Sequence, residues 1–318
     1  MMDLVRLSSR RVFPPGGEDL YRQVARLTDL SPDMEFLDVA SGRGIPLEYF
    51  AREYGVHGTG VEDDPRLVEE AEAHARAEGL LGRVSFQEAS SDDLPFRDET
   101  FDVVLGEVGL AAGADPKEAI RELARVTRPG GQVVLIQLVW KAPVDEVRRQ
   151  VLSAHLGARP LMMMEVRRVL LEAGVGDLVT EDWTNEEMAF RRQAKKPFPD
   201  FSELFTMREK LGILRRAWRR WGWRGVLTVF QREAEVHRLL GKERLLGLNL
   251  LKGTKAPAQP GEGDVVQSDA EPLPGPTEPS SGEGVPAQET LGPPEAGSEQ
   301  DGDLQTTGLP LFGAETPE

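Results

Sequence analysis

Two acidic residues occupy positions where parallel strands would bring them to one edge of a sheet. Asp38 lies within the apolar stretch 35–39, and Glu62 follows a second such stretch. Ligands of open α/β sheets bind at the carboxyl ends of the strands. A carboxylate there offers two acceptor oxygens to two adjacent hydroxyl groups, such as those of a ribose. The bland interpretation of Glu62 is an exposed turn acid, because Asp63 and Asp64 follow it.

A loop of small residues follows the first of these strands. It reads Ala40-Ser41-Gly42-Arg43-Gly44, and Pro46 comes at the start of the helical pattern after it. Gly42 and Gly44 lack a Cβ, so the chain can turn tightly and a ligand can lie against the backbone. Strand, glycine turn and helix together direct backbone N–H groups at a ligand. Alone this signal is weak, because many such units bind nothing.

Five short apolar stretches alternate with helical patterns in the first half of the chain. This alternation indicates βαβ units and therefore an α/β fold with a parallel sheet. The expected strands are 35–39, 56–61, 83–87, 101–105 and 132–139, and the expected helices are 18–28, 45–54, 65–78 and 115–128.

The second half has a different organisation. We expect helices over 144–152 and 163–173 and strands over 174–183 and 245–251. Between the two strands we expect a helical insertion, about 185–243, whose core is a stretch over 198–241 rich in Arg and Trp. The run Met162-Met163-Met164 is interpreted as core filling.

Composition sets the outer limits. The tail, 255–318, has thirteen acidic residues and one lysine, a net charge of −12, which leaves −4 of the chain's −16 for residues 1–254. The tail is rich in Pro, Gly, Ser and Glu, so we expect it to be disordered and residues 1–254 to form one domain. The chain has no cysteine, no expected metal site and no run of about 18 apolar residues. We expect a soluble, cytoplasmic protein.

The sequence resembles the class I S-adenosylmethionine-dependent methyltransferases, in the branch that acts on small molecules, quinones and lipids. The resemblance covers roughly residues 17–185 and rests on segments in the family's order: Leu37–Gly44, Gly60-Val61-Glu62, Ser91–Phe96 with Phe101–Val104, and Ala119–Val126 with Arg128–Gly131. Each segment is weak alone, and the order and spacing together are specific. The resemblance implies a Rossmann-like, seven-stranded, mostly parallel sheet with helices on both faces and one antiparallel edge strand.

The resemblance also implies site residues for S-adenosylmethionine. Asp38 and the loop Ala40–Gly44 would hold the methionine end, and Glu62 would bind the ribose. Glu107 would line the methionine and acceptor side, where it is also the candidate base. The remaining implied contacts with the cofactor are Tyr21, Asp63, Ser90, Ser91 and Asp92, with Gly17 a further candidate cover.

Two positions depart from the family pattern. Ala40 replaces the first glycine of the loop, which is tolerable where φ stays negative. Ser90 stands where the family usually has an acid for the adenine amino group, and a hydroxyl accepts that hydrogen bond less strongly than a carboxylate. Asp92 or Asp93 can substitute.

Several alternatives stay open at this point. Glu107 can equally be an ordinary residue that closes a strand, His155 is better interpreted as a surface residue, and Gln137 and Trp140 either line the acceptor site or simply pack. The leading hypothesis is in-line methyl transfer to a small or amphipathic acceptor. Its rivals are a nucleotide-dependent oxidoreductase of the same fold and a non-catalytic scaffold that works through its insertion and tail. Arsenic methylation is disfavoured because the chain has no cysteine.

The Arg/Trp stretch 211–224 allows four interpretations. As a helix it places Leu211, Leu214, Trp218 and Trp221 on one face, with the arginines largely outside it. It can pack on the sheet domain, cover the acceptor site, contact an anionic membrane surface, or contact nucleic acid. Nucleic acid is not expected, because the body has no overall positive charge. The oligomeric state cannot be predicted.

Overall fold

The computed structural model describes residues 11–112, 115–156, 158–184, 205–239 and 243–257. The expected tail beyond Pro257 and the stretch 185–204 of the expected insertion lie outside the described residues. The helices are α2 (Gly17–Leu27), α3 (Ile45–Tyr54), α4 (Pro65–Ala77), the 3₁₀ helix η1 (Val108–Ala111), α5 (Pro116–Val126), α6 (Glu146–Leu156), α7 (Met163–Glu172) and α9 (Met207–His237).

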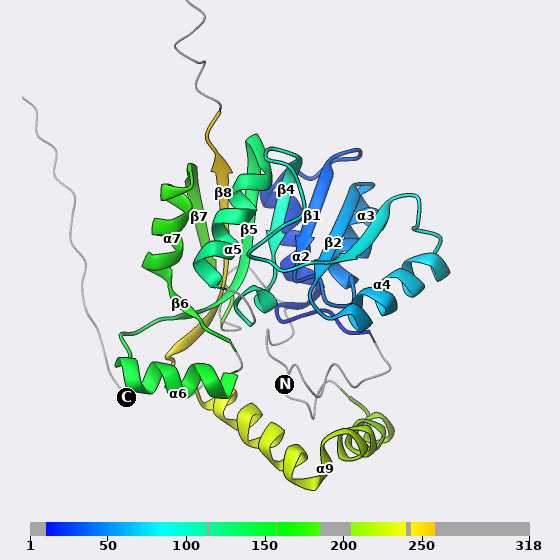
Figure 1. Cartoon of the computed structure of the whole chain (residues 1–318), viewed down its shortest axis with the longest axis vertical. Coiled ribbons are helices and arrows are strands. Elements are labelled where there is room, and N and C mark those ends of the chain that lie inside the picture. Colours follow the sequence, from blue (N-terminus) through cyan, green and yellow to red (C-terminus); the bar gives the residue numbers. More distant parts are fainter. Residues whose placement is uncertain (1–10, 113–114, 157, 185–204, 240–242, 258–318) are drawn as a thin grey trace, which may run out of the picture. The chain divides into compact units, whose positions relative to one another are not determined.

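The strands form one mostly parallel sheet, as the sequence predicts (Figure 1). The spatial order along it is β3-β2-β1-β4-β5-β8-β7, and the two-residue β6 pairs with β5. The strands are β1 (Glu35–Val39), β2 (His57–Glu62), β3 (Val84–Glu88), β4 (Phe101–Gly106), β5 (Thr127–Trp140), β6 (Leu161–Met162), β7 (Val175–Asp182) and β8 (Leu246–Lys255).

The antiparallel strand is not at the edge of the sheet, where the resemblance placed it. β8 runs antiparallel to both of its neighbours, β5 and β7, and β7 forms the edge. Nine register pairs, from Gln132↔Thr254 to Trp140↔Leu246, join β5 to β8. β8 therefore continues to Lys255, a residue that the sequence analysis assigns to the tail.

Helices cover both faces of the sheet, because successive strand residues point to opposite sides. Phe36, Val103 and Ile136 belong to one buried cluster with residues of α2, α3 and α4. Leu37 and Val104 belong to a second cluster with residues of α5 and α7. The parallel strands are thus buried on both faces, as their unbroken apolar sequences require.

Local signals explain where two of the helices begin. Asp64 and Asp115 each precede a proline, and each side chain accepts a hydrogen bond from a backbone N–H of the first turn, from Arg66 at 3.0 Å and from Lys117 at 2.9 Å. These caps satisfy N–H groups that the helix itself cannot pair.

Strand β5 is longer than the sequence predicts. It begins at Thr127, which pairs with Phe101, and the next pair is Val103 with Gln132. Residues 128–131, expected as a turn, form an irregularity inside the strand, with Gly130 at φ 77°. A turn at residues 128–131 is correctly predicted from the sequence, but the pairing of β5 with β4 both before and after this turn is not.

The insertion helix α9 does not bury the face that the sequence predicts. Gly222, at φ 66° and ψ 178°, breaks the helical conformation within it. Ile213 and Ala217 are fully buried, in a cluster with Phe205 and Val229. Leu211 and Trp218, on the expected packing face, are 71% and 66% exposed. No helix in the described part of the chain is both long and apolar enough to cross a membrane.

Candidate active site

Three buried carboxyl groups lie at the carboxyl ends of adjacent strands. Asp38 is in β1, whose neighbours in the sheet are β2 and β4; Glu62 ends β2, and Glu107 directly follows β4. Their exposed fractions are 0%, 6% and 4%. The structure therefore brings together the three acids that the sequence singles out, and it does so by strand order rather than by closeness along the chain.

Asp38 has no hydrogen-bond partner for either carboxylate oxygen. Burial raises the pKa of Asp38 well above its usual range, and the nearby carboxyl groups of Glu107 and Glu62 raise it further. A buried carboxylate without a partner is unfavourable by several kcal/mol, on the order of the cost of desolvating an ion. Asp38 is therefore a group that a cationic or hydrogen-bond-donating ligand would stabilise.

Glu107 is held by Tyr21 from α2. The Tyr21 hydroxyl donates to Glu107 Oε2 at 2.9 Å, while Oε1 has no partner. Burial raises the pKa of Glu107 to about 8, although the hydrogen bonds from Tyr21 and from the backbone of Val108 act in the opposite direction. Burial and the proximity of Glu107 also raise the pKa of Tyr21 well above its usual value. Glu107 is thus mostly protonated at neutral pH in the free protein.

The backbone of Glu107 is fixed as well. Its N–H donates to the carbonyl of Val39 at 3.0 Å, and its carbonyl accepts from Gln137 Nε2 at 2.9 Å. Gln137 is 8% exposed and lies in β5. Gln137 therefore positions the start of the segment after β4, and Trp140, 1% exposed, packs in a separate apolar cluster.

Glu62 closes the small-residue loop. Its Oε2 accepts from the N–H of Gly42 at 2.8 Å, and its Oε1 accepts from the N–H of Asp64 at 3.4 Å. The carboxylate thus joins the end of β2 to the loop after β1. Asp63, beside it, is exposed.

The loop after β1 is left-handed at three positions. Ala40, Gly42 and Gly44 have φ values of 61°, 56° and 69°. A Cβ added at Gly44 would lie 2.3 Å from the ring of Phe86, so the loop approaches β3 too closely for a side chain there. The Ser41 N–H donates to the carbonyl of Val61 at 2.9 Å, while its buried hydroxyl has no hydrogen-bond partner.

Ala40 does not meet the condition under which a methyl group is readily tolerated at this position, a negative φ. Its φ of 61° lies in the left-handed region, which costs an L-residue about 1–2 kcal/mol. A Cβ added at Gly109 would lie 3.2 Å from the Ala40 Cβ, so the methyl group also approaches the segment after β4. The loop therefore carries local strain that a glycine would relieve.

The loop after β3 contains the residues expected near adenine. Ser90 Oγ donates to Asp92 Oδ1, and this hydrogen bond is the first cause that lowers the pKa of Asp92. Ser90 is exposed, whereas Ser91 and Asp92 are half-buried. The serine that replaces the family acid therefore lies beside a carboxylate, and Asp92 is the charged acceptor at this position.

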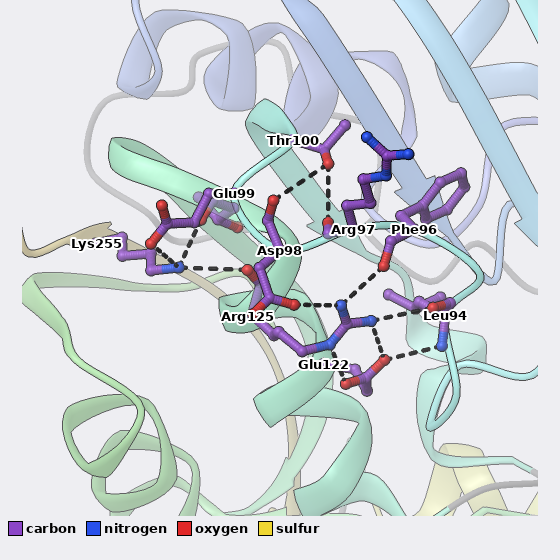
Figure 2. Close-up of polar contacts among 10 residues, drawn as sticks. Leu94, Phe96, Arg97, Asp98, Glu99, Thr100, Glu122, Arg125 and Lys255 are labelled. Carbon is purple, nitrogen blue, oxygen red and sulfur yellow. Dashed lines mark hydrogen bonds and ion pairs between the residues drawn. The ribbon is translucent and has the colours of Figure 1, made fainter. Parts of the chain in front are cut away.

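Arg125 of α5 holds this loop in place, a role that the sequence analysis missed. Figure 2 shows its guanidinium between the loop and α5. It donates to the carbonyls of Leu94 at 3.0 Å and Phe96 at 2.8 Å and pairs with Glu122 at 2.6 Å. Glu122 in turn accepts from the N–H of Leu94 at 2.9 Å. No spacing rule connects residue 125 to a loop some 30 residues earlier.

Arg11 is a second residue that the sequence analysis missed. It pairs with the buried Glu48 of α3 at 2.6 Å and donates to the carbonyl of Arg43, within the loop after β1. The N-terminal segment is therefore tied to that loop on one side and, through Tyr21, to Glu107 on the other.

Two further residues named in the sequence analysis are not brought into the site by any described contact. Gly17, at the start of α2, is half-buried, and the side chain of His155 lies outside the described residues.

Comparison with known proteins identifies the kind of domain to which these strands belong. Residues 37–135, from β1 into β5, match the family described as "Methyltransferase domain". These residues therefore form a methyltransferase domain. The matched region includes the strands that carry Asp38, Glu62 and Glu107 and the loop that carries Ser90.

The curated relatives of this methyltransferase domain are of the small-molecule type. Methyltransferase GfsG of Streptomyces halstedii is 29% identical over 207 residues, which cover 64% of this chain and 74% of GfsG. The ubiquinone/menaquinone biosynthesis C-methyltransferase UbiE of Idiomarina loihiensis is 33% identical over 120 residues, 37% of this chain and 47% of UbiE. The chain thus spans about half the length of that quinone enzyme.

A solved structure shares the fold. The crystal structure titled "[4+2]-Cyclase SpnF" aligns with a TM-score of 0.58 at 24% identity, covering 75% of this chain and 81% of that one. This likeness concerns the fold alone. None of these comparisons supports the alternative of a non-catalytic scaffold.

Proposed function

We propose that the protein transfers the methyl group of S-adenosylmethionine to a small, amphipathic acceptor at the edge formed by β1, β2 and β4. The observation that carries the proposal is the set of three buried carboxyl groups, Asp38, Glu62 and Glu107. Both oxygens of Asp38 and one oxygen of Glu107 have no partner, although each is buried. An edge of this kind fits a ligand with positive charge and several hydrogen-bond donors.

The residues present fit S-adenosylmethionine. Asp38 would hold its ammonium group, for which the two unpartnered oxygens are suitable acceptors. Glu62 would accept from the ribose hydroxyls while it still holds Gly42. Ser90, Ser91 and Asp92 would lie against the adenine, with Asp92 as the acceptor for its amino group. The loop Ala40–Gly44, with the buried hydroxyl of Ser41, would lie along the cofactor, and Asp63 would lie at its outer side.

When bound, S-adenosylmethionine supplies a methyl group that its positively charged sulfur has already activated for displacement. The protein's task is then to align an acceptor atom with that methyl group and to exclude water. Tyr21, fully buried against Glu107, covers the edge from α2. Asp38 and Glu107 provide the negative charge, and a cation beside them would lower both pKa values because it favours the ionised forms.

Glu107 is the proposed contact with the acceptor. Its Oε1 has no partner, so it can accept a hydrogen bond from an acceptor group or remove a proton from it. Its pKa of about 8 lies close enough to neutrality for both the neutral and the ionised form to be available. A base is required only when the acceptor must lose a proton, and Glu107 would then serve as that base.

The acceptor class is proposed from the surroundings and the relatives. Leu110 of η1, which is 1% exposed, lies next to Glu107, because its N–H donates to the Glu107 carbonyl at 2.9 Å. UbiE, by its name, methylates carbon in the formation of ubiquinone and menaquinone, which join an aromatic head group to an apolar chain. An acceptor with one polar, nucleophilic end and one apolar end fits both observations.

Transfer of label from S-adenosylmethionine tests the proposal. The full chain would be incubated with S-adenosylmethionine carrying a labelled methyl group and with aqueous and organic extracts of cells. We expect label in a small molecule of the organic extract, formed by the wild type and by Glu118→Gln, an exposed acid of α5, but not by Asp38→Asn. Label that appears equally with Asp38→Asn, or in neither extract although the cofactor binds, would contradict the proposal.

A further inference from the structure

The insertion helix α9 has one apolar side that is already covered. Ile213 and Ala217 of its first half are fully buried and cluster with Val229 of its second half, beyond the break at Gly222. This contact joins the two halves to each other. The burial of Ile213, Ala217 and Val229 is therefore explained by packing between the two halves of α9.

A second apolar line on α9 is exposed. Met207, Leu211 and Trp218 are 77%, 71% and 66% exposed, and their spacing of four and seven residues places them on one face of the helix. Beyond the break, Trp223 and Leu227, four residues apart, are 66% and 47% exposed. We call these five residues the apolar stripe. Each half of α9 thus exposes large apolar side chains that its own packing does not require.

Basic residues flank the apolar stripe. Residues 207–224 contain seven Arg and Lys and one Glu, in a chain whose net charge is −16. Arg215 lies between Leu211 and Trp218 in helical spacing, and Arg219 follows Trp218. Within the described part of the chain, no ion pair neutralises Arg215 or Arg219. The positive charges of Arg215 and Arg219 are therefore available to an external anion.

We propose that α9 docks on the surface of an anionic phospholipid bilayer, with the apolar stripe among the acyl chains and the flanking arginines at the phosphates. Tryptophan prefers the membrane–water interface, and long arginine side chains reach the head groups while their stems lie along apolar surface. A helix with this division between basic and apolar sides binds in the plane of the interface.

Charge and side-chain type favour the bilayer over other occupants. The chain has a net charge of −16, whereas residues 207–224 carry seven Arg and Lys and one Glu, so α9 is a local basic segment that an anionic surface attracts. A nucleic acid would match the arginines and the tryptophans, but it offers no partner for Met207, Leu211 and Leu227. Lipid matches both parts of the surface. The inference does not depend on the methyl acceptor.

Vesicle binding by the full chain tests the inference. The vesicles would be phosphatidylcholine alone or an equal mixture of phosphatidylcholine and phosphatidylglycerol. We expect sedimentation with the mixed vesicles only, weaker binding at higher salt, and a blue shift of tryptophan fluorescence. The double variant Arg215→Glu/Arg219→Glu should weaken binding by at least about 30-fold, since each positive charge lost near an anionic surface contributes about 1 kcal/mol and the two added carboxylates are repelled. Trp218→Ser/Trp223→Ser should abolish the blue shift.

Matched controls make the result decisive. Arg168→Glu removes a basic side chain of α7 that is 62% exposed, and it should leave vesicle binding unchanged. The decrease in vesicle binding by the wild type at higher salt tests the role of charge without any substitution. Equal binding to both kinds of vesicle, or unchanged binding by both double variants, would overturn the inference. So would binding of a single-stranded oligonucleotide that the mixed vesicles do not displace, or a dimer in sedimentation velocity that Trp218→Ser/Trp223→Ser dissolves. Titration with S-adenosylmethionine, run on the same samples, reports separately on the proposed function.

Discussion

The carboxyl edge of the sheet and the insertion helix α9 are opposite in charge and in exposure. At the edge, Asp38, Glu62 and Glu107 are buried and acidic, and both oxygens of Asp38 and one oxygen of Glu107 have no hydrogen-bond partner. On α9, tryptophans and arginines are exposed on a chain that is otherwise acidic. Each region is energetically unfavourable without a partner. At the edge, a small cation with several hydrogen-bond donors would stabilise the buried carboxyl groups. At α9, an anionic surface with an apolar interior would cover the exposed apolar side chains.

The comparison also separates two kinds of rigidity. The edge is built from strands paired on both sides, and hydrogen bonds from Tyr21, Gly42 and Gln137 hold its acids or their backbone. The halves of α9 are held together by a small cluster around Ile213, Ala217 and Val229. A site that must align reacting atoms needs the first kind of support, whereas a surface that adapts to lipid can function with the second.

Removing the acid at the end of β2 should have the largest effect on the edge. Glu62→Ala loses both the proposed ribose acceptor and the hydrogen bond from Gly42, so affinity for S-adenosylmethionine should fall about 100-fold. Calorimetric titration measures it. Glu62→Gln keeps an acceptor for Gly42 and should lose less. Wild-type affinity in Glu62→Gln, with a loss only in Glu62→Ala, would assign Glu62 to the loop alone.

Neutralising Glu107 should change how stability depends on pH. Burial raises the pKa of Glu107 to about 8, so the native state binds this proton more tightly than the unfolded state does. The resulting stability is present below about pH 4.5 and is lost as the pH rises through 8. Glu107→Gln should therefore gain stability relative to the wild type as the pH rises from 5 to 9, because only the wild type must ionise a buried carboxyl group. Urea unfolding at pH 5, 7 and 9 measures this, and a difference that does not change with pH would refute it.

Two arginines one turn apart on α5 have different roles. Arg125 supports the loop after β3, whereas Arg121 forms a surface ion pair, so substitutions at the two positions should differ in their effect on stability. Arg125→Ala removes the donors to Leu94 and Phe96 and should lower the free energy of unfolding by about 1.5 kcal/mol. Arg121 pairs with Glu118 on the surface, where the two side chains are 47% and 52% exposed. Arg121→Ala should therefore change stability by less than about 0.5 kcal/mol. Urea unfolding of both variants tests the contrast, and equal effects would mean that the loop after β3 does not depend on Arg125.

Relieving the strain in the loop after β1 should have the smallest effect. Ala40→Gly removes the left-handed cost at φ 61° but adds backbone entropy to the unfolded state. The net gain should be about 0.5–1 kcal/mol in the free energy of unfolding. Thermal unfolding measures it. A loss of stability would mean that contacts of the Ala40 methyl group outweigh its strain.

Much of the edge could be predicted from sequence because the information there is local. Strand, glycine turn and helix are encoded in consecutive residues, and the chain order of the strands brings Asp38, Glu62 and Glu107 together. The roles of Arg125 and Arg11 could not be predicted, because each acts on a loop about 30 residues away in sequence. The positive φ of Ala40 could not be predicted, since residue type favours a negative value and only the loop's closure requires a positive one.

The second half of the chain was harder to predict for the same physical reason. β8 pairs with β5, more than a hundred residues earlier, and no local pattern indicates that it lies between β5 and β7. In α9, the helical period correctly groups Leu211 with Trp218, but the period does not indicate which face packs. The glycine at 222 decides this, because the break lets the helix fold back on Ile213 and Ala217.

Calorimetric titration of Asp38→Asn with S-adenosylmethionine is the most direct test of the central claim, that the buried acids at the carboxyl edge form the cofactor site. Asparagine has nearly the same shape but no charge, so the fold should persist and the free protein should lose a buried repulsion. We predict lower affinity for the cofactor together with equal or higher thermal stability, while Arg215→Glu/Arg219→Glu on α9 binds the cofactor like the wild type. Unchanged cofactor affinity in a folded Asp38→Asn variant would contradict the account.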